Sequence, residues 1–213
     1  VEEVGIDVDK VKSYVSAYTF VEMEKEEPDE KTNYIAEARA AYSPSKVTAY
    51  TDRYWNSHNS AYPNFENMGG DCANFVSQAL RAGGKSMKGT DASNFSNWFC
   101  RTNSTNQLSK VSSTWRGADA FGHYWMANAK KYKKFGASYF SSADKFKTVY
   151  NYGSVGDAIS VLNSNGRPYH TLIISYKEDG KLKFASHTDN HKWKSLYNYI
   201  REGGKDPVRI YKM

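Results

Sequence analysis

The segment Gly69–Leu80 reads GGDCANFVSQAL and predicts the start of a buried helix with a cysteine in its first turn. Asp71 is an N-cap candidate, apolar residues recur after it at helical spacing, and Gly83-Gly84 supplies the stop. A thiol in the first turn feels the positive end of the helix dipole, which lowers its pKa and raises its thiolate fraction. The segment predicts either a nucleophilic Cys72 or a small cysteine that begins a core helix, because cysteine is among the most often buried residues.

A histidine begins the second of three predicted strands in the C-terminal part of the chain. The first follows a turn within 152–162, and the next two, rich in β-branched and aromatic residues, cover 169–176 and 182–189. The dipeptides Asn165-Gly166 and Asp179-Gly180 between them are two-residue hairpin signals. The pattern predicts an antiparallel meander in which His170 opens the middle strand.

The second hairpin sets a register for this histidine. With a type I′ turn at Asp179-Gly180, His170 faces Asp189 and Leu172 faces His187, so both polar residues lie on the His170 face. A polar side chain on the next strand can accept from an imidazole and fix its tautomer, as the third member of a Cys-His-polar triad does. A lone strand histidine is more often a satisfied core or surface residue, but the two polar neighbours favour catalysis.

Several short motifs together resemble the putative amidase domain family of bacterial cell-surface proteins. They fall in the family's order over roughly residues 42–213 and comprise YWNSHNSAYPNF at 54–65, GGDCANFVSQ at 69–78, STW at 113–115, GDAI at 156–159, YH at 169–170 and SHTD at 186–189. One departure is Ala79, where the family more often has a cysteine; this position faces the core. The family in turn resembles the NlpC-type papain-like cysteine peptidases that cut peptidoglycan.

The resemblance implies roles for individual residues. Cys72 would be the nucleophile and His170 the base, with His187 as the orienting residue and Asp189 as its rival. Tyr62 upstream of the cysteine would line the site and help to stabilise the oxyanion, and the adjacent Asp71 is counted with the substrate site. Tyr62 alone is otherwise a turn residue before Pro63. No metal or organic cofactor is expected: His187 and His191 are four residues apart, but they lie on a predicted strand and no Glu stands between them.

The chain divides near residue 43 into an acidic helical segment, 1–42, and a papain-like domain, 43–213. Ser43 and Pro44 are placed as the cap and first turn of a helix, followed by the Cys72 helix, a long polar excursion over 85–113 and a helix or helix pair over 115–135. After residue 152 only strands and turns are expected. Helices first and an antiparallel sheet last give an α+β class, with N-terminal helices packed on a C-terminal sheet.

Composition and cysteine content limit the cellular location that we expect for this protein. Mean hydropathy is −0.74 and no apolar run reaches the length of a membrane span. The chain begins at Val1 without a signal-peptide pattern, so we expect a processed or excised piece of a longer precursor. Cys100, after Trp98-Phe99, is expected to be a buried spectator rather than a disulfide partner of the nucleophile. These features suit an exported bacterial enzyme, secreted or at the surface of a Gram-positive cell.

Bases outnumber acids between Arg81 and Tyr150, and the whole chain carries a net charge of +6. A basic face attracts anionic polymers, and cell-wall teichoic acid, carboxylate-bearing peptidoglycan or nucleic acid would all qualify. The family resemblance implies peptidoglycan or another anionic cell-wall polymer as the partner. No nucleic-acid-reading motif is present, so no nucleic acid is expected. Alternatively, these lysines form only a solvated, lysine-rich face of a helix over Trp125–Phe135 and bind no polymer. Two other function classes stay open: a non-catalytic wall- or partner-binding module, and a protein-directed cysteine peptidase or acyltransferase.

Overall fold

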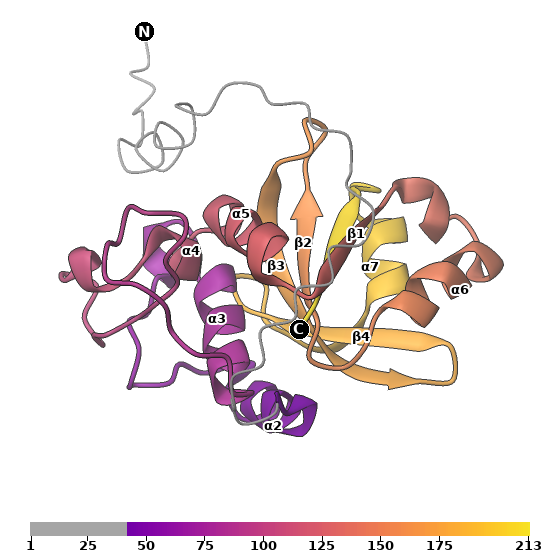
Figure 1. Ribbon diagram of the computed structural model, residues 1–213. Helices are drawn as coiled ribbons and strands as arrows, with labels where there is room; N and C mark the ends of the chain where they lie inside the picture. Colours follow the sequence, from indigo (N-terminus) through magenta and orange to yellow (C-terminus); the bar gives the residue numbers. More distant parts are fainter. Residues whose placement is uncertain (1–41) are drawn as a thin grey trace, which may run out of the picture.

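The computed structural model describes residues 42–213, which form an α+β fold of helices and a six-stranded antiparallel sheet (Figure 1). The helices are α2 (Pro44–Tyr54), α3 (Cys72–Ala82), α4 (Ser113–Arg116), α5 (Ala118–Asn128), α6 (Ala143–Tyr152) and α7 (Leu196–Glu202). The strands are β1 (Lys131–Phe135), β2 (Ala158–Leu162), β3 (Pro168–Glu178), β4 (Lys181–Ser186), β5 (His191–Ser195) and β6 (Val208–Lys212), in the order β1-β6-β2-β3-β4-β5. The predicted acidic helical segment lies outside the described residues, apart from its last residue.

Local sequence explains where the first described helix begins. The Ser43 hydroxyl accepts a hydrogen bond from the Lys46 N–H at 3.4 Å, and Pro44 occupies the first turn, where its missing N–H costs nothing. Val47 is fully buried against α3. The predicted start of this helix is therefore confirmed.

The sheet separates two hydrophobic cores. The α3-side core contains Phe75, Ile173 and Ala185 among its buried residues, and the α7-side core contains Leu172, Ile174 and Phe184. Neighbouring residues of β3 thus enter opposite cores, as the two-residue period of a strand requires. In Figure 1, α2 to α5 lie on one side of the sheet, and α6 and α7 lie on the other.

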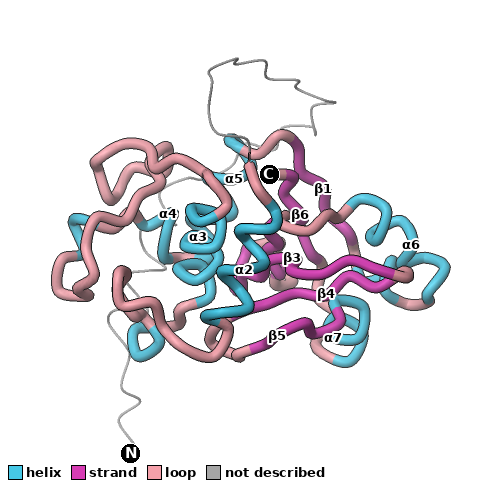
Figure 2. The backbone as a smooth tube through the Cα atoms, turned by 90° about the horizontal axis from the view of Figure 1, so that it is seen from below, coloured by secondary structure: helices cyan, strands magenta, loops and turns pink. Residues whose placement is uncertain are grey.

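The second hairpin has the predicted turn but not the predicted register throughout. Asp179 and Gly180 have φ of 47° and 74°, as a type I′ turn needs, and Glu178 pairs with Lys181. A register shift between Ile174 and Tyr176 then pairs Ile174 with Phe184 and Ile173 with Ala185. The predicted pairing of His170 with Asp189 and of Leu172 with His187 is wrong, because the irregularity moves the partner strand by one residue. Figure 2 shows β3, β4 and β5 side by side.

Two predictions of secondary structure are also wrong. Lys131–Phe135 is an edge strand rather than part of a helix, with Lys131, Lys133 and Lys134 exposed. Helix α7 interrupts the part of the chain predicted to hold only strands and turns.

The excursion over 85–113 also differs from a purely surface segment. Two isolated bridges, Lys88 with Trp98 and Cys100 with Val111, fold it back on itself. Trp98 is fully buried, and its indole N–H donates to the Ser77 hydroxyl of α3 at 3.1 Å. Part of this polar stretch therefore belongs to the α3-side core.

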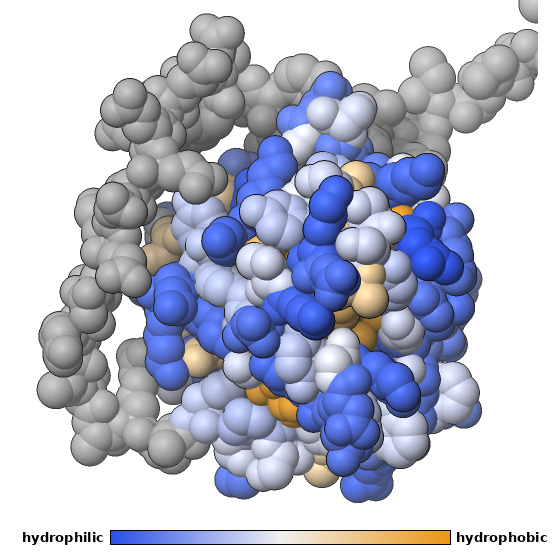
Figure 3. All heavy atoms as spheres, turned by 90° about the vertical axis from the view of Figure 1, so that its right-hand side faces the viewer, coloured by the Kyte–Doolittle hydropathy of each residue, from blue (hydrophilic) through white to orange (hydrophobic). Residues whose placement is uncertain are grey.

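The surface of the described part is largely polar. The face that carries α6 and α7 is mostly hydrophilic, with small separate apolar patches (Figure 3). None of the helices within residues 42–213 is long and apolar enough to cross a bilayer.

Candidate active site

Cys72 is the first residue of α3, as the sequence predicts, and lies at a tightly built corner of the fold. Gly69 and Gly70 precede it with φ of 98° and 119°, a backbone region in which side chains are strained. A Cβ on Gly70 would approach the Thr188 hydroxyl to 3.0 Å, and that hydroxyl accepts a hydrogen bond from the Asp71 N–H at 2.9 Å. The glycine pair therefore lets the start of α3 dock against the chain that leaves β4.

The thiol of Cys72 is buried rather than activated in the resting protein. Only 8% of the residue is exposed, and burial raises its thiol pKa. Hydrogen bonding to the backbone and hydroxyl of Thr171 opposes this effect, whereas the charge of Asp71 adds to it. The prediction of a lowered pKa is wrong because desolvation is the largest influence on this thiol.

His170 is also buried, and it is poised as a neutral base. Its Nε2 is enclosed without a hydrogen-bond partner. Burial lowers the pKa of its imidazole to about 4; the charge of Asp189 acts in the opposite direction, and His191 lowers it further. At neutral pH the ring is therefore uncharged and has a nitrogen free to accept a proton.

Thr171 links the two predicted catalytic residues. Cys72 lies against Thr171, which directly follows His170 in β3. The alternation of β3 places the Thr171 side chain with Ile173 and the His170 side chain with Leu172, on the other face of the sheet. Among the hydrogen bonds of residues 42–213, none joins Cys72 to His170, so the structure brings their backbones together but not their side chains.

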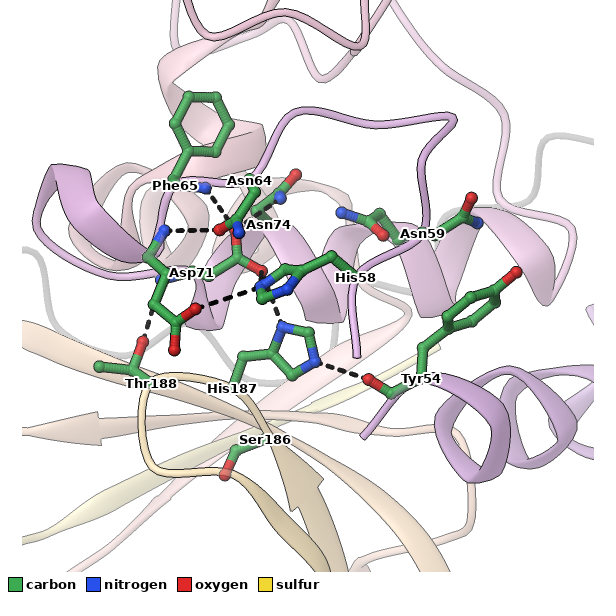
Figure 4. Close-up of polar contacts among 12 residues, drawn as sticks. Tyr54, His58, Asn59, Asn64, Phe65, Asp71, Asn74, Ser186, His187 and Thr188 are labelled. Carbon is green, nitrogen blue, oxygen red and sulfur yellow. Dashed lines mark hydrogen bonds and ion pairs between the residues drawn. The ribbon is translucent and has the colours of Figure 1, made fainter. Parts of the chain in front are cut away.

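His187 has a different set of partners from the one predicted. Its Nδ1 lies 2.7 Å from Asp71 Oδ2 and its Nε2 lies 2.7 Å from the Tyr54 carbonyl oxygen, while its ring stacks on Phe75 at 4.0 Å between centroids (Figure 4). Both ring nitrogens are thus occupied away from His170. In this arrangement His187 does not orient His170.

Asp71 is the centre of this cluster, not a side-chain helix cap. Its Oδ1 accepts from the Phe65 N–H at 2.9 Å and from Asn74 Nδ2 at 2.8 Å, and no side-chain capping bond to α3 is formed. A buried carboxylate with these donors repels a developing oxyanion, so Asp71 is not suited to the substrate role predicted for it.

The Tyr54 carbonyl fixes the role of one His187 nitrogen. A carbonyl oxygen only accepts, so Nε2 donates its proton to Tyr54. Asp71 accepts two N–H groups on Oδ1, and its Oδ2 lies 2.7 Å from His187 Nδ1. Asp71 and His187 therefore form a buried polar pair at the start of α3.

Two tyrosines complete the surroundings. Tyr62 stacks on Trp115 with 5.7 Å between ring centroids, and burial raises its pKa. Tyr199 in α7 was not singled out from the sequence; burial and the charges of Asp189 and Cys72 raise its pKa. It lies in a helix that the sequence analysis did not predict, so nothing in the local sequence pointed to it.

Both cysteines are buried and neither forms a disulfide, as expected for Cys100.

The buried imidazole of His170 predicts a pH-dependent stability. Because its pKa falls from 6.5 unfolded to about 4 folded, its contribution is complete above pH 6.5 and is lost as pH falls toward 4. His170→Gln should remove about 3 kcal/mol of this pH dependence. Urea unfolding of both proteins between pH 7 and pH 4.5 measures it. His123→Gln, at an exposed histidine, is the control and should keep the wild-type slope; the same slope in His170→Gln would contradict the assignment.

Comparisons with known proteins identify the family to which the chain belongs. Residues 41–211 match the family model described as "Putative amidase domain". The chain is 31% identical over 146 residues to the uncharacterized protein YhbB of Bacillus subtilis (strain 168). That alignment covers 68% of this chain and 40% of the relative, so the chain spans less than half the length of that protein. No solved structure matches the chain. Because the family model spans most of its length, the chain belongs to the putative amidase domain family.

Proposed function

We propose that the protein is a cysteine amidase or endopeptidase that hydrolyses peptide amide bonds of bacterial peptidoglycan. The family supports amide hydrolysis as the reaction class. The observation that carries the cysteine mechanism is the position of the Cys72 thiol against Thr171, directly beside His170, whose buried Nε2 is unpaired and uncharged. A nucleophile and a vacant base on adjacent segments are the parts that thiol-dependent acyl transfer needs.

The resting side chains lie on opposite faces of β3, so the proposal includes a rearrangement of the start of β3 that turns the His170 side chain toward Cys72 when substrate binds. Catalytic hydrogen bonds are often long or absent before the substrate arrives. The irregular pairing of β2 and β3 favours such freedom, since Val161 pairs with His170 but Leu162 pairs with Pro168. Tyr169 is left out of the ladder beside His170 and is half exposed.

The proposed reaction has two stages. His170 takes the thiol proton while Cys72 Sγ attacks the amide carbonyl, which gives a tetrahedral oxyanion. The C–N bond then breaks, and His170 returns the proton to the leaving amine. Water hydrolyses the resulting thioester, with His170 again as base, and regenerates the thiol. The Cys72 backbone N–H at the start of α3 is the proposed oxyanion donor, a contribution of about 3–4 kcal/mol.

Asp189 is the proposed orienting residue, in place of His187. Its charge already acts on His170 in the resting protein, whereas the two nitrogens of His187 bind Asp71 and Tyr54. Tyr199 feels the charges of both Cys72 and Asp189 and so lies near the proposed reaction centre. Tyr62 remains a proposed wall of the substrate site through its stack on Trp115.

The substrate and location are proposed on chemical grounds. An excess of lysine and arginine between Arg81 and Tyr150 suits an anionic cell-wall polymer, and a secreted or surface location gives access to it. Purified muropeptides incubated with the protein should yield shorter stem peptides or released amines, identified by mass spectrometry. Intact muropeptides, together with cleavage of unrelated proteins, would overturn the substrate class; no cleavage of any amide would overturn the enzyme.

Asp189→Asn should reduce turnover by about 10-fold to 100-fold, because the imidazole loses the charge that holds it. Since Asp189 raises the pKa of His170, its loss should also move the acid limb of the kcat/KM profile to lower pH. The matched control is Asp179→Asn at the tip of the β3–β4 hairpin, where asparagine tolerates the positive φ. An unchanged acid limb in Asp189→Asn would show that Asp189 does not act on the base.

A further inference from the structure

We infer that His58, Asp71 and His187, joined by Glu66, form a binding site for one divalent transition-metal ion, with Zn²⁺ as the ion of best fit. One ligand atom from each of the first three residues lies within 4.8 Å of the others. This site is separate from the thiol chemistry proposed above and does not depend on it. The three side chains converge in Figure 4 from segments far apart in the sequence.

The spacing of the donor atoms suits an ion between them. Asp71 Oδ2 lies 2.7 Å from His187 Nδ1 and 3.8 Å from His58 Nε2, and Glu66 Oε2 lies 3.7 Å from the same Nε2. Ligands bound tetrahedrally to Zn²⁺ at about 2.0–2.1 Å are separated by about 3.3 Å. The three pairs would each change by about half an ångström to reach this separation, and the widest spacing in the group, up to 4.8 Å, would close by about 1.5 Å.

The groups behind the ligands are arranged as they are in metal sites. His187 directs Nε2–H at the Tyr54 carbonyl, which leaves Nδ1 to face Asp71 Oδ2. The other oxygen of Asp71 is held by the Phe65 N–H and by Asn74 Nδ2. Outer hydrogen bonds of this kind orient ligating histidines and carboxylates. An ion would replace the proton between Nδ1 and Oδ2.

His58 distinguishes this site from the buried Asp71–His187 pair alone. Asp71 and His187 satisfy each other, but His58 lies within ion-pair range of two carboxylates and is too far from either for a hydrogen bond. Its ring meets the His187 ring edge-on, with 5.0 Å between centroids. The side chains of His58 and Glu66 are 32% and 47% exposed, which gives an ion a route from solvent.

The donor set selects the type of ion. Two imidazole nitrogens with one or two carboxylate oxygens are typical of Zn²⁺, whereas Mg²⁺ and Ca²⁺ prefer oxygen ligands throughout. The ion would tie the chain after α2 to the start of α3 and to the end of β4. It would therefore stabilise the corner that carries Cys72.

The test measures ion binding directly, without substrate. The metal-stripped full chain is titrated with Zn²⁺ by calorimetry and with Co²⁺ by visible absorption. We expect one ion per chain, strong tetrahedral Co²⁺ bands and a higher unfolding temperature with Zn²⁺. His58→Ala should weaken binding at least about 100-fold while leaving the partly exposed position folded, as circular dichroism would confirm.

Two control variants separate this site from its neighbours. His123→Ala removes an exposed histidine far from the cluster in sequence, and Cys72→Ser removes the thiol; both should bind the ion as the wild type does. No binding by the wild type, or unchanged affinity in His58→Ala, would overturn the site, and so would loss of binding in Cys72→Ser. Amide hydrolysis by the metal-stripped protein is scored separately, so a failed metal site and a failed enzyme assignment give different results.

Discussion

Replacing Cys72 by serine is expected to lower the rate of amide hydrolysis by about 10⁴-fold or more while the fold stays intact. Serine nearly matches the volume of cysteine, so the buried start of α3 can accept it. The hydroxyl, however, is a far poorer nucleophile and holds its proton more tightly than a thiol does. Steady-state hydrolysis of a synthetic stem-peptide amide measures the loss, and circular dichroism monitors the fold.

Cys100→Ser is the matched control for this variant. Cys100 is buried too, its Sγ donates to the Thr102 carbonyl at 3.3 Å, and burial raises its pKa to about 11. It should therefore retain turnover within a few-fold of the wild type. Full activity in Cys72→Ser would remove the thiol from the mechanism, whereas equal losses in both variants would indicate damage to the shared core.

Asp71→Ala is expected to destabilise the protein by about 3–5 kcal/mol, because it leaves Nδ1 of the buried His187 without its partner. The variant also removes the acceptor for the Phe65 N–H and for Asn74 Nδ2. These losses fall at one corner, so the start of α3 and the chain after β4 should loosen together. Urea unfolding measures the free energy, and hydrogen exchange at residues 65–75 locates the change.

Asp119→Ala provides the comparison for this loss. Asp119 pairs with Arg167 at 2.7 Å, but both side chains are partly exposed, so their pairing is screened by solvent. Its removal should cost less than about 1 kcal/mol. A similarly small cost for Asp71→Ala would mean that the Asp71–His187 pair does not hold the corner.

Much of this fold follows from short-range signals in the sequence. Pro44 after a serine cap, the apolar spacing after Cys72 and the dipeptide Asp179-Gly180 each act within a few residues. Such signals depend on backbone geometry and local capping, which distant parts of the chain do not alter. The helices α2 and α3 and the β3–β4 hairpin were predictable for this reason.

The arrangement of the candidate site depends on longer-range effects. One register shift near Ser175 changes which residues of β3 and β4 face each other, and no residue type in that stretch announces it. The thiol pKa of Cys72 likewise depends on burial by segments distant in sequence. His58 lies in a loop without periodicity, so its approach to Asp71 could be found only in the folded chain.

The lysines on both outer strands have a consequence for how copies of this protein meet. Strands β1 and β5 end the sheet, and their exposed residues include Lys133, Lys134, Lys192 and Lys194. Two copies that approached edge to edge would bring like charges together along unpaired backbone, and their repulsion opposes joining the sheets. At high protein concentration these edge lysines oppose growth into fibrils, and high salt would weaken that protection.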